Sequence, residues 1–580
     1  MNKKPSYPPP YTVIDGSLYQ EIMQGKSKLT KKLCNFVPYL IAEVVHDDGA
    51  ELKRFYRIGA THADGYSLPE VSIPESDFAA MNWIGKFWGS CCNPSVGQSV
   101  RDNIRFAILA TAEGIERETI YAHLGWAKID GEWQYLIPGG DFNVCLDGNM
   151  ENYRFQDGVT SCESSKSFAL ISSGLAPDEI TFPLLAVCYL SPLNEFLRQA
   201  GCEPKTLLAL IGKTGSKKST LAALFLSHFG SFTMDRLPLS FRDTANSILH
   251  RLFALKDVPT VVDDFHPSTR KEEIGMTATF QMLTRAFGDK TARGRMRADL
   301  TLETPRPPRG NGIITAEFAP DISESGTARY FELELAPNSV NMSLLTEFQQ
   351  AAVDGTLQLA MRSYIEYLKT LLSDEKAFVA SLSKMFSEQR RAFRDALITA
   401  DSNCHDRLPD ACAWLMIGFQ FAINYFTASD VLPFSSGSEY IIKMRLRLLE
   451  LAKNQSKKIY SDKPSEKFLH KLFSLVDSGT VTITNRIAPT EGCNLVGYQD
   501  ESYIYLLKDA AHKAVRKLCD EQGENFSISS SALLTELESD GLLERAPNGE
   551  RTRSVKVGGT NKRLMLLFKN KVAEIVGVAL

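Results

Sequence analysis

The stretch 207-LLALIGKTGSKKSTLAALFLSHFG-230 joins an apolar run, a loop rich in Gly, Lys and Ser, and a second apolar run at helical spacing. This order predicts a buried strand, a loop and a helix, which is the setting of a phosphate-binding loop. The pattern G-x-x-x-x-G-K-[ST] fits at Gly212, Lys218 and Ser219, but Lys217 stands where the last glycine is expected. The alternative is an ordinary Lys/Ser-rich turn between a strand and a helix.

A phosphate loop binds anions because successive backbone N–H groups and a helix N-terminus point at the same place. In this loop Lys218 is expected to reach the β- and γ-phosphates, and the Ser219 hydroxyl to hold Mg²⁺. ATP and Mg²⁺ are therefore the predicted cofactors. The predicted nucleotide-binding residues are Gly212, Lys213, Thr214, Gly215, Ser216, Lys217, Lys218, Ser219 and Thr220.

A second motif, 258-VPTVVDDFHP-267, places two carboxylates at the end of an apolar strand. Asp263 is predicted to complete the Mg²⁺ site, and Asp264 to orient or deprotonate the attacking water. Adjacent carboxylates are costly to bury without a cation, which favours this interpretation. The alternative is that Asp264 or Ser268 caps the following helix.

A third strand, 312-GIITAEFAP-320, ends in polar residues at the position of a γ-phosphate sensor, and Glu317 is the candidate. A fourth strand lies in 325-SGTARYFELEL-335, with Arg329 just before it. An arginine there suits an arginine finger that reaches the ATP of a neighbouring subunit. The alternative role for Arg329 is a surface salt bridge.

Between these strands lies 288-GDKTARGRMRADLTLETPRPPRG-310, which predicts a β-hairpin with positive charge on one face. Such a hairpin in a ring pore would contact the phosphates of a single DNA strand. A solvated charged hairpin is the alternative, and some of these arginines could instead serve ATP. The predicted DNA-binding residues here are Lys290, Arg293, Arg295 and Arg297.

The 580 residues are enough for about three or four domains, and the segment order predicts a multidomain α/β protein. Residues 1–150 are expected to form an α+β domain, and 151–342 a P-loop ATPase core around a parallel sheet. A helical segment follows over 343–461. Residues 462–580 are expected to form a winged-helix-like domain.

The C-terminal stretch 531-SALLTELESDGLLERAPNGERTRSVKV-557 predicts an amphipathic helix followed by a hairpin, the order of a winged helix. From Arg545 to Lys569 there are seven Lys/Arg against one acid, which favours DNA contact. Arg551 and Arg553 are the predicted contacts. A protein-docking role for this domain stays open.

The bulk composition limits partners and compartment. The net charge is -4, so DNA contact must come from local patches. No apolar run reaches the roughly 18 residues of a membrane span, and the N-terminus lacks the pattern of a signal peptide. Eleven cysteines occur without a metal-binding pattern, and an isolated Cys404–His405 pair is expected to be incidental. These features predict a cytoplasmic protein with no membrane partner.

The order of these motifs resembles AAA+ ATPases of the pre-sensor-1 hairpin group, which includes minichromosome-maintenance (MCM) and superfamily 3 helicases. MCM proteins often carry a non-glycine residue before the loop lysine, so the resemblance implies that Lys217 is tolerated and Lys218 is the catalytic lysine. More closely, the chain resembles MCM-like self-loading helicases of staphylococcal chromosome cassettes and related mobile elements. The shared features are 33-LCNFVPYLIAEV-44, 123-HLGWAK-128 and 239-LSFRDTANSI-248.

The resemblance implies a hexameric, ATP-driven DNA helicase that replicates a mobile element. Its expected partners are single-stranded and forked DNA, with element-encoded replication proteins as candidates. Two residues depart from the family pattern: Glu317 replaces an asparagine, and Asp264 replaces a glutamate. Two other functions stay open: an ATP-switched DNA-binding initiator that does not unwind processively, and a AAA+ remodeller of proteins.

Overall fold

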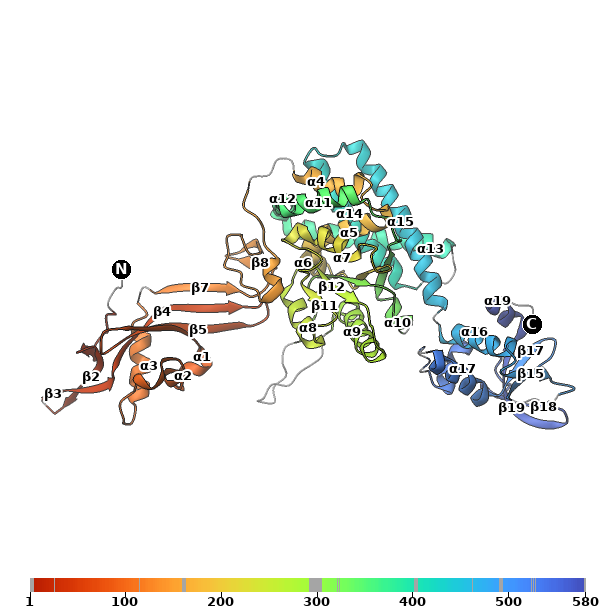
Figure 1. The fold of residues 1–580 in the computed structure, drawn as a ribbon, viewed down its shortest axis with the longest axis horizontal. Coiled ribbons are helices and arrows are strands. Elements are labelled where there is room, and N and C mark those ends of the chain that lie inside the picture. The colour runs from red at the N-terminus through yellow and green to blue at the C-terminus, as the bar shows by residue number, and fades with distance from the viewer. Residues whose placement is uncertain are drawn as a thin grey trace.

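The computed structural model describes residues 5–577, apart from 26, 114, 159–162, 292–304, 321, 323, 401–404, 462, 490–493, 523, 525 and 527. The predicted DNA-binding residues Arg293, Arg295 and Arg297 lie outside the described residues. The chain is drawn out from a group of N-terminal strands, through a large central body, to a separate C-terminal part (Figure 1).

The N-terminal part holds two sheets, with strand orders β1-β2-β3 and β6-β5-β4-β7. Alternate residues of β4 are buried, as expected for a strand with one face on a core. Helix α3 buries Val100, Ile104, Ala107 and Ile108 at helical spacing against this core. The elements are β1 (Tyr11–Ile14), β2 (Ser17–Gln24), β3 (Ser27–Cys34), β4 (Phe36–Asp47), β5 (Leu52–His62), β6 (Ser67–Pro74), α1 (Glu75–Phe78), α2 (Trp83–Trp88), α3 (Val100–Ala110) and β7 (Glu116–Tyr121).

The predicted hairpin over 124–140 is present as β8 (Gly125–Ile129) and β9 (Glu132–Leu136). Its turn residues Asp130 and Gly131 both have positive φ, as a two-residue hairpin turn requires. The hairpin packs into the core of the central body, where Trp126 is fully buried and donates from Nε1 to the carbonyl of Pro192 at 2.7 Å. The central core thus begins before residue 150.

The central body is built on a five-stranded sheet in the order β11-β12-β13-β10-β14, and each neighbouring pair is parallel. All five residues of β10 are buried, because helices cover both faces of such a sheet. The elements are α4 (Glu163–Ser172), α5 (Asp178–Leu190), α6 (Asn194–Gln199), β10 (Leu207–Ile211), α7 (Lys218–Leu226), β11 (Leu239–Ser240), α8 (Ala245–Ala254), β12 (Pro259–Phe265), α9 (Arg270–Asp289), β13 (Asn311–Ala316), α10 (Glu324–Thr327) and β14 (Tyr330–Glu334).

A helical region follows, as predicted for 343–461, and shares the apolar core of the central body. Its long last helix leads toward the C-terminal part (Figure 1). The helices are α11 (Met342–Val353), α12 (Thr356–Leu371), α13 (Glu375–Ala400), α14 (Arg407–Ala428) and α15 (Phe434–Ser461).

The C-terminal part has its own core and a mixed sheet in the order β15-β16-β17-β19-β18. Helices α16, α17 and α18 pack on one another, and α17 also packs on β16. The elements are α16 (Pro464–Asp477), β15 (Thr482–Asn485), β16 (Leu495–Gln499), β17 (Tyr503–Leu506), α17 (Lys508–Gln522), α18 (Ser530–Ser539), β18 (Arg553–Val557), β19 (Thr560–Phe568) and α19 (Lys569–Val576).

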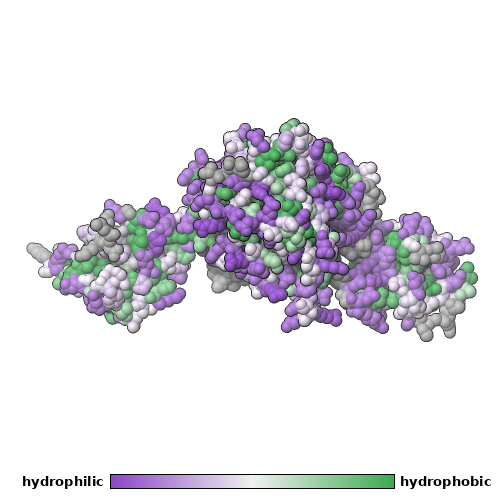
Figure 2. Space-filling model, turned by 45° about the horizontal axis from the view of Figure 1, so that its top comes forward, coloured by the Kyte–Doolittle hydropathy of each residue, from purple (hydrophilic) through white to green (hydrophobic). Residues whose placement is uncertain are grey.

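Two described stretches, Asp178–Gln199 and Arg407–Ala428, are long and apolar enough to cross a membrane. They are 100% and 78% buried inside the fold, as core helices are, so they are weak evidence for a membrane span. The face of the central body seen in Figure 2 is mostly hydrophilic, with small hydrophobic groups between the polar ones.

Candidate nucleotide-binding site

The loop between β10 and α7 has the shape that phosphate binding requires. A Cβ on Gly212 would lie 2.6 Å from the carbonyl oxygen of Leu335, so only glycine fits at the exit from β10. Gly215 has φ +86°, and α7 begins at Lys218. The Ser216 hydroxyl is buried in this loop with no hydrogen-bond partner in the part of the chain that the structure describes. The loop therefore offers a helix N-terminus and an unsatisfied hydroxyl to an anion.

Lys217 adopts the left-handed conformation, with φ +72° and ψ +24°. This explains why the pattern expects glycine there, because a residue with a Cβ is strained in this region by about 1–2 kcal/mol. The carbonyl of Lys217 still accepts the first helical hydrogen bond, from the N–H of Leu221 at 2.9 Å. The loop therefore leads directly into α7 with lysine at this position.

The two motifs meet at one edge of the sheet. Ser219 Oγ donates to Asp263 Oδ1 at 2.7 Å, and Thr315 Oγ1 donates to the same carboxylate oxygen. Since β12, β13 and β10 are neighbouring parallel strands, their carboxyl ends bring these three side chains together. A hydroxyl and a carboxylate in contact are suitable ligands for Mg²⁺.

Thr315 also accepts a hydrogen bond from the backbone N–H of Asp264 at 3.1 Å. Asp264 itself has φ +71°, at a point where the pairing of β12 with β13 is irregular. Thr315 therefore positions both acids. The sequence reasoning missed it, and the only available signal was a polar residue at the end of an apolar strand.

Glu317 follows β13 and lies against the phosphate loop. Its Oε1 accepts from the backbone N–H of Thr214 at 3.1 Å and from Oγ1 of the same residue at 2.7 Å. Its other oxygen pairs with His266 Nδ1. The hydrogen bonds from Thr214 hold the pKa of the Glu317 carboxyl below its usual value, and His266 lowers it further. This carboxylate occupies a backbone donor of the loop that could otherwise face phosphate.

Lys218 extends along the loop, with Nζ 3.4 Å from the carbonyl oxygen of Lys213. Burial lowers the pKa of the Lys218 ammonium, while the carboxylates of Glu317, Asp263 and Asp264 act to raise it. The ammonium group is thus partly desolvated in front of three acids. A partly desolvated cation is attracted more strongly to a bound polyphosphate than a fully hydrated one would be.

Arg242, just after β11, pairs with Asp264 Oδ2 at 3.2 Å. Its side chain is 77% exposed, so the pair can open without unpacking the core. The candidate water-orienting acid is therefore held by a guanidinium in this state. Sequence reasoning gave Arg242 no role.

Arg329 and the phosphate loop lie at opposite ends of the parallel strands: Arg329 at the amino-terminal ends, and the loop at the carboxyl ends. In the parallel pairing of β10 with β14, Leu207 faces Tyr330 and Ile211 faces Glu334. The loop follows Ile211, whereas Arg329 precedes Tyr330, so the two ends are separated by about 16 Å of strand at ~3.3 Å per residue. Arg329 is bound within the chain to Asp289, and it does not approach the loop of its own chain.

Among the residues that the structure describes, the basic side chains predicted to bind DNA mostly contact groups of their own chain. Lys290 caps α9, and its side chain is only 8% exposed, 3.2 Å from the carbonyl oxygen of Pro308 and 3.6 Å from Glu203. This placement differs from the predicted one on a solvent-facing hairpin, because the side chain is buried against its own chain. Arg551 pairs with Glu538, and Arg553 lies 4.0 Å from Glu544.

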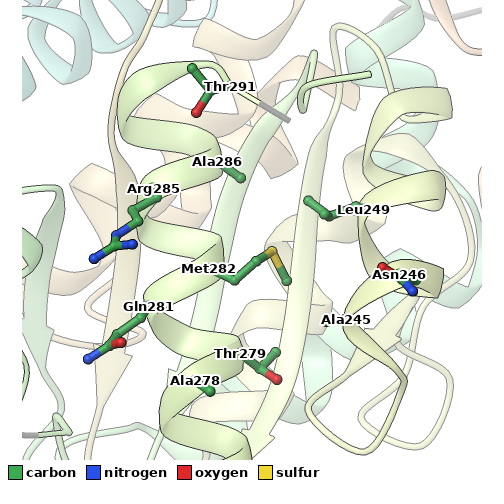
Figure 3. A pocket seen from close by; sticks show the side chains of 10 residues that line it. All are labelled: Ala245, Asn246, Leu249, Ala278, Thr279, Gln281, Met282, Arg285, Ala286 and Thr291. Carbon is green, nitrogen blue, oxygen red and sulfur yellow. The ribbon is translucent and has the colours of Figure 1, made fainter. Parts of the chain in front are cut away.

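A separate cavity of about 530 Å³ lies between α8 and α9. Leu249 and Met282 point toward one another across it, whereas Gln281 and Arg285 point away (Figure 3). None of the predicted site residues that the structure describes lines this cavity.

Comparison with known proteins gives a likeness in fold. No protein-family model matches the sequence, and no curated protein matches it. Among solved structures, the SCCmec type IV Cch active helicase is similar with a TM-score of 0.58, over 98% of this chain and 99% of that chain, at 13% identity. The chain therefore shares its multidomain α/β fold with Cch along nearly its whole length.

Two further structures match less well. The C-terminal region of NrS-1 has a TM-score of 0.23 at 12% identity, over 67% of this chain and 92% of that one. The JCV helicase has a TM-score of 0.19 at 15% identity, over 44% of this chain and 70% of that one. Both TM-scores are too low to indicate a shared fold.

Proposed function

We propose that this protein is an ATP-driven DNA helicase that works as a ring of identical subunits. The observation that carries the proposal is the position of two groups on the sheet: Lys218, Ser219 and Asp263 at one edge, and Arg329 at the other. A nucleotide bound by one copy can therefore meet Arg329 only from another copy. Hexamers of such copies, with a site at each interface, are the proposed working form.

The chain's own residues divide the chemistry between them. Lys218 and the N-terminus of α7 bind the β- and γ-phosphates, and Ser219 and Asp263 hold Mg²⁺. Bound Mg²⁺ neutralises charge on the phosphate oxygens. Asp264 orients the attacking water once Arg242 leaves it. Glu317 acts as the sensor from its place against Thr214.

The fold likeness to Cch, a structure described as an active helicase, supports DNA as the substrate. Arg293, Arg295 and Arg297 remain the proposed contacts to a single strand, without Lys290. The C-terminal part is proposed as a winged helix that uses Arg553, and also Arg551 once it leaves Glu538. The proposed substrates are single-stranded and forked DNA. The proposed location is the cytoplasm, and the proposed partners are element-encoded replication proteins.

The proposed assignment within the AAA+ class is the MCM-like one. Its domains are 1–150, the motor 151–342, the helical segment 343–461 and the winged helix 462–580. The apolar core joins 124–155 to the motor, so the functional boundary of the first domain is proposed near residue 122.

Mixing two inactive variants tests whether the active site is shared. Lys218→Ala and Arg329→Ala should each lose ATP hydrolysis, for different reasons. Mixed together, they form some interfaces with an intact Lys218 beside an intact Arg329, and those sites should recover activity. Exchange between tagged and untagged subunits must first be demonstrated. If subunits exchange and hydrolysis stays at background, Arg329 does not act between subunits and the ring mechanism is rejected.

A further inference from the structure

Two arginines share one carboxylate at the sheet edge opposite the phosphate loop. Arg329 binds Asp289 through Nε to Oδ1 at 3.2 Å and through Nη2 to Oδ2 at 3.1 Å. Arg407, the first residue of α14, binds Oδ1 of the same Asp289 through Nη2 at 3.0 Å. Three elements, the end of α9, the start of β14 and the start of α14, thus meet at a single carboxyl group.

The backbone is shaped for this meeting. Gly288 lies in the last turn of α9, where glycine costs about 0.5–1 kcal/mol relative to alanine. A Cβ there would lie 2.8 Å from Arg329 Cγ, so glycine is what lets the arginine lie against the helix. The carbonyl of Gly288 also accepts from Arg407 Nη1 at 2.9 Å.

The cavity beside these arginines is lined by side chains of both charges. A cavity of about 420 Å³ reaches Asp289 and Arg407 and is also lined by Lys205. Its two other acids have cations of their own. Glu203 is paired with Lys290 at 3.6 Å, and Asp410 with Arg390 at 2.5 Å. Asp289 therefore faces the guanidiniums of Arg329 and Arg407 as the single acid bound to both.

We propose that Arg329 and Arg407 form a two-arginine site for one phosphate group of a nucleotide held by a neighbouring copy, and that Asp289 occupies this site in the separate chain. Phosphate oxygens accept the same charged N–H donors as a carboxylate, so one anion can replace the other. Asp289 is then a positioning residue that keeps both arginines oriented and competes with subunit association. This inference rests on the proposed ring ATPase and adds Arg407 and Asp289 to it.

The test uses Asp289→Asn, which keeps the side-chain size and removes the charge. An interface that forms without breaking two ion pairs should assemble at lower protein concentration. We expect the concentration for half-maximal specific ATPase activity to fall by about fivefold or more, within the range that ion pairs contribute. Mass measured by light scattering with Mg²⁺ and a slowly hydrolysed ATP analogue should show the same shift without depending on turnover.

Three control variants separate this role from a structural one. Asp410→Asn removes an acid from the same cavity that pairs with Arg390, and should leave the midpoint unchanged. Asp289→Glu keeps the charge, so its concentration for half-maximal ATPase activity should stay within about twofold of the wild-type value. Arg407→Ala should lose activity and regain it when mixed with Lys218→Ala.

Each outcome decides the question. A merely structural Asp289 would make Asp289→Asn less stable, with an unchanged or raised midpoint, and that result overturns the proposal. Should the Asn variant not fold, failure of Lys218→Ala to rescue Arg407→Ala overturns the proposal. A wild type without Mg²⁺-dependent hydrolysis would reject the proposed ATPase itself, which is a distinguishable failure.

Discussion

The hydroxyl of Ser219 lies 2.7 Å from a carboxylate oxygen of Asp263, although 44 residues separate them in the chain. This contact brings the end of β12 and the start of α7 together. Replacing Ser219 by alanine should reduce Mg²⁺-dependent ATP hydrolysis at least about tenfold, while threonine should retain it, because its hydroxyl can occupy the same place. Steady-state hydrolysis across a Mg²⁺ titration checks this, with the exposed Ser231→Ala as control. Equal activity of the alanine variant would remove Ser219 from the metal site.

The left-handed backbone conformation of Lys217 predicts that substitutions there act through backbone strain rather than through charge. Lys217→Gly should keep or raise hydrolysis, because glycine adopts φ +72° without strain. Lys217→Val should destabilise the protein by about 1–2 kcal/mol, since a β-branched residue is least tolerant of this conformation. Thermal unfolding and ATPase assays measure both variants. A valine variant as stable as the glycine variant would show that the loop does not need this backbone conformation.

The exposed pair between Arg242 and Asp264 predicts a change in resting turnover. Removing the guanidinium with Arg242→Gln leaves Asp264 available to water, so DNA-independent hydrolysis should rise. Arg251→Gln, which breaks a neighbouring pair with Asp243 at 3.3 Å, is the matched control and should not change it. A fall in resting turnover for Arg242→Gln alone would instead assign the arginine to substrate binding.

The buried Asp257 predicts a pH dependence of stability. Burial raises the pKa of its carboxyl from 3.8 to about 6, although Lys256 opposes the shift. Because the unfolded chain loses this proton first, the folded state loses stability as pH rises from about 4 to about 6, by a total on the order of 1–3 kcal/mol. Asp257→Asn should therefore gain in melting temperature relative to the wild type between pH 4 and pH 7.

A second carboxyl in the same network titrates in the opposite sense. The pKa of Glu195 is lowered to about 2 by Lys256 and Arg198 against the effect of burial. Its stabilisation is present above pH 4.5 and is lost as pH falls toward 2, so it adds little slope over the window where Asp257 titrates. Asp354→Asn, at an exposed position, is the control for Asp257→Asn and should not change the pH dependence of the melting temperature. A constant difference between Asp257→Asn and wild type across pH 4–7 would contradict the prediction.

The predicted DNA contacts can be tested without a structure of their segment. Replacing Arg295 and Arg297 by alanine should weaken single-strand binding and lower the slope of log K against log salt by roughly 0.7 for each lost phosphate contact. DNA-independent hydrolysis should survive. Unchanged DNA affinity with lost hydrolysis would move these arginines to the nucleotide site.

Local features of the site could be predicted because they depend on neighbouring residues in the chain. Five consecutive apolar residues predicted a buried strand, and the structure has β10 at Leu207–Ile211. The position of Gly212 and the two acids of β12 followed from motif spacing. The parallel sheet was likewise predictable from the alternation of strands and helices.

Features that depend on strand order or on distant partners could not be predicted. The sequence does not show that β13 lies between β12 and β10, so it gave no reason to select Thr315. It also could not reveal that Lys290 would be buried beside Glu203. The amphipathic helix predicted within 531–557 is present as α18, yet it contains no Lys or Arg, and its Glu538 binds Arg551.

The separation of the phosphate loop and Arg329 across one sheet gives each copy a head and a tail. In the proposed ring, two such copies would join head to tail and leave an unmatched half-site at each free end, so a pair could not complete both sites. An open row always has one complete site fewer than it has copies, and only closure makes the numbers equal. Opening the proposed ring at any one junction would therefore remove a single catalytic site and leave the others intact.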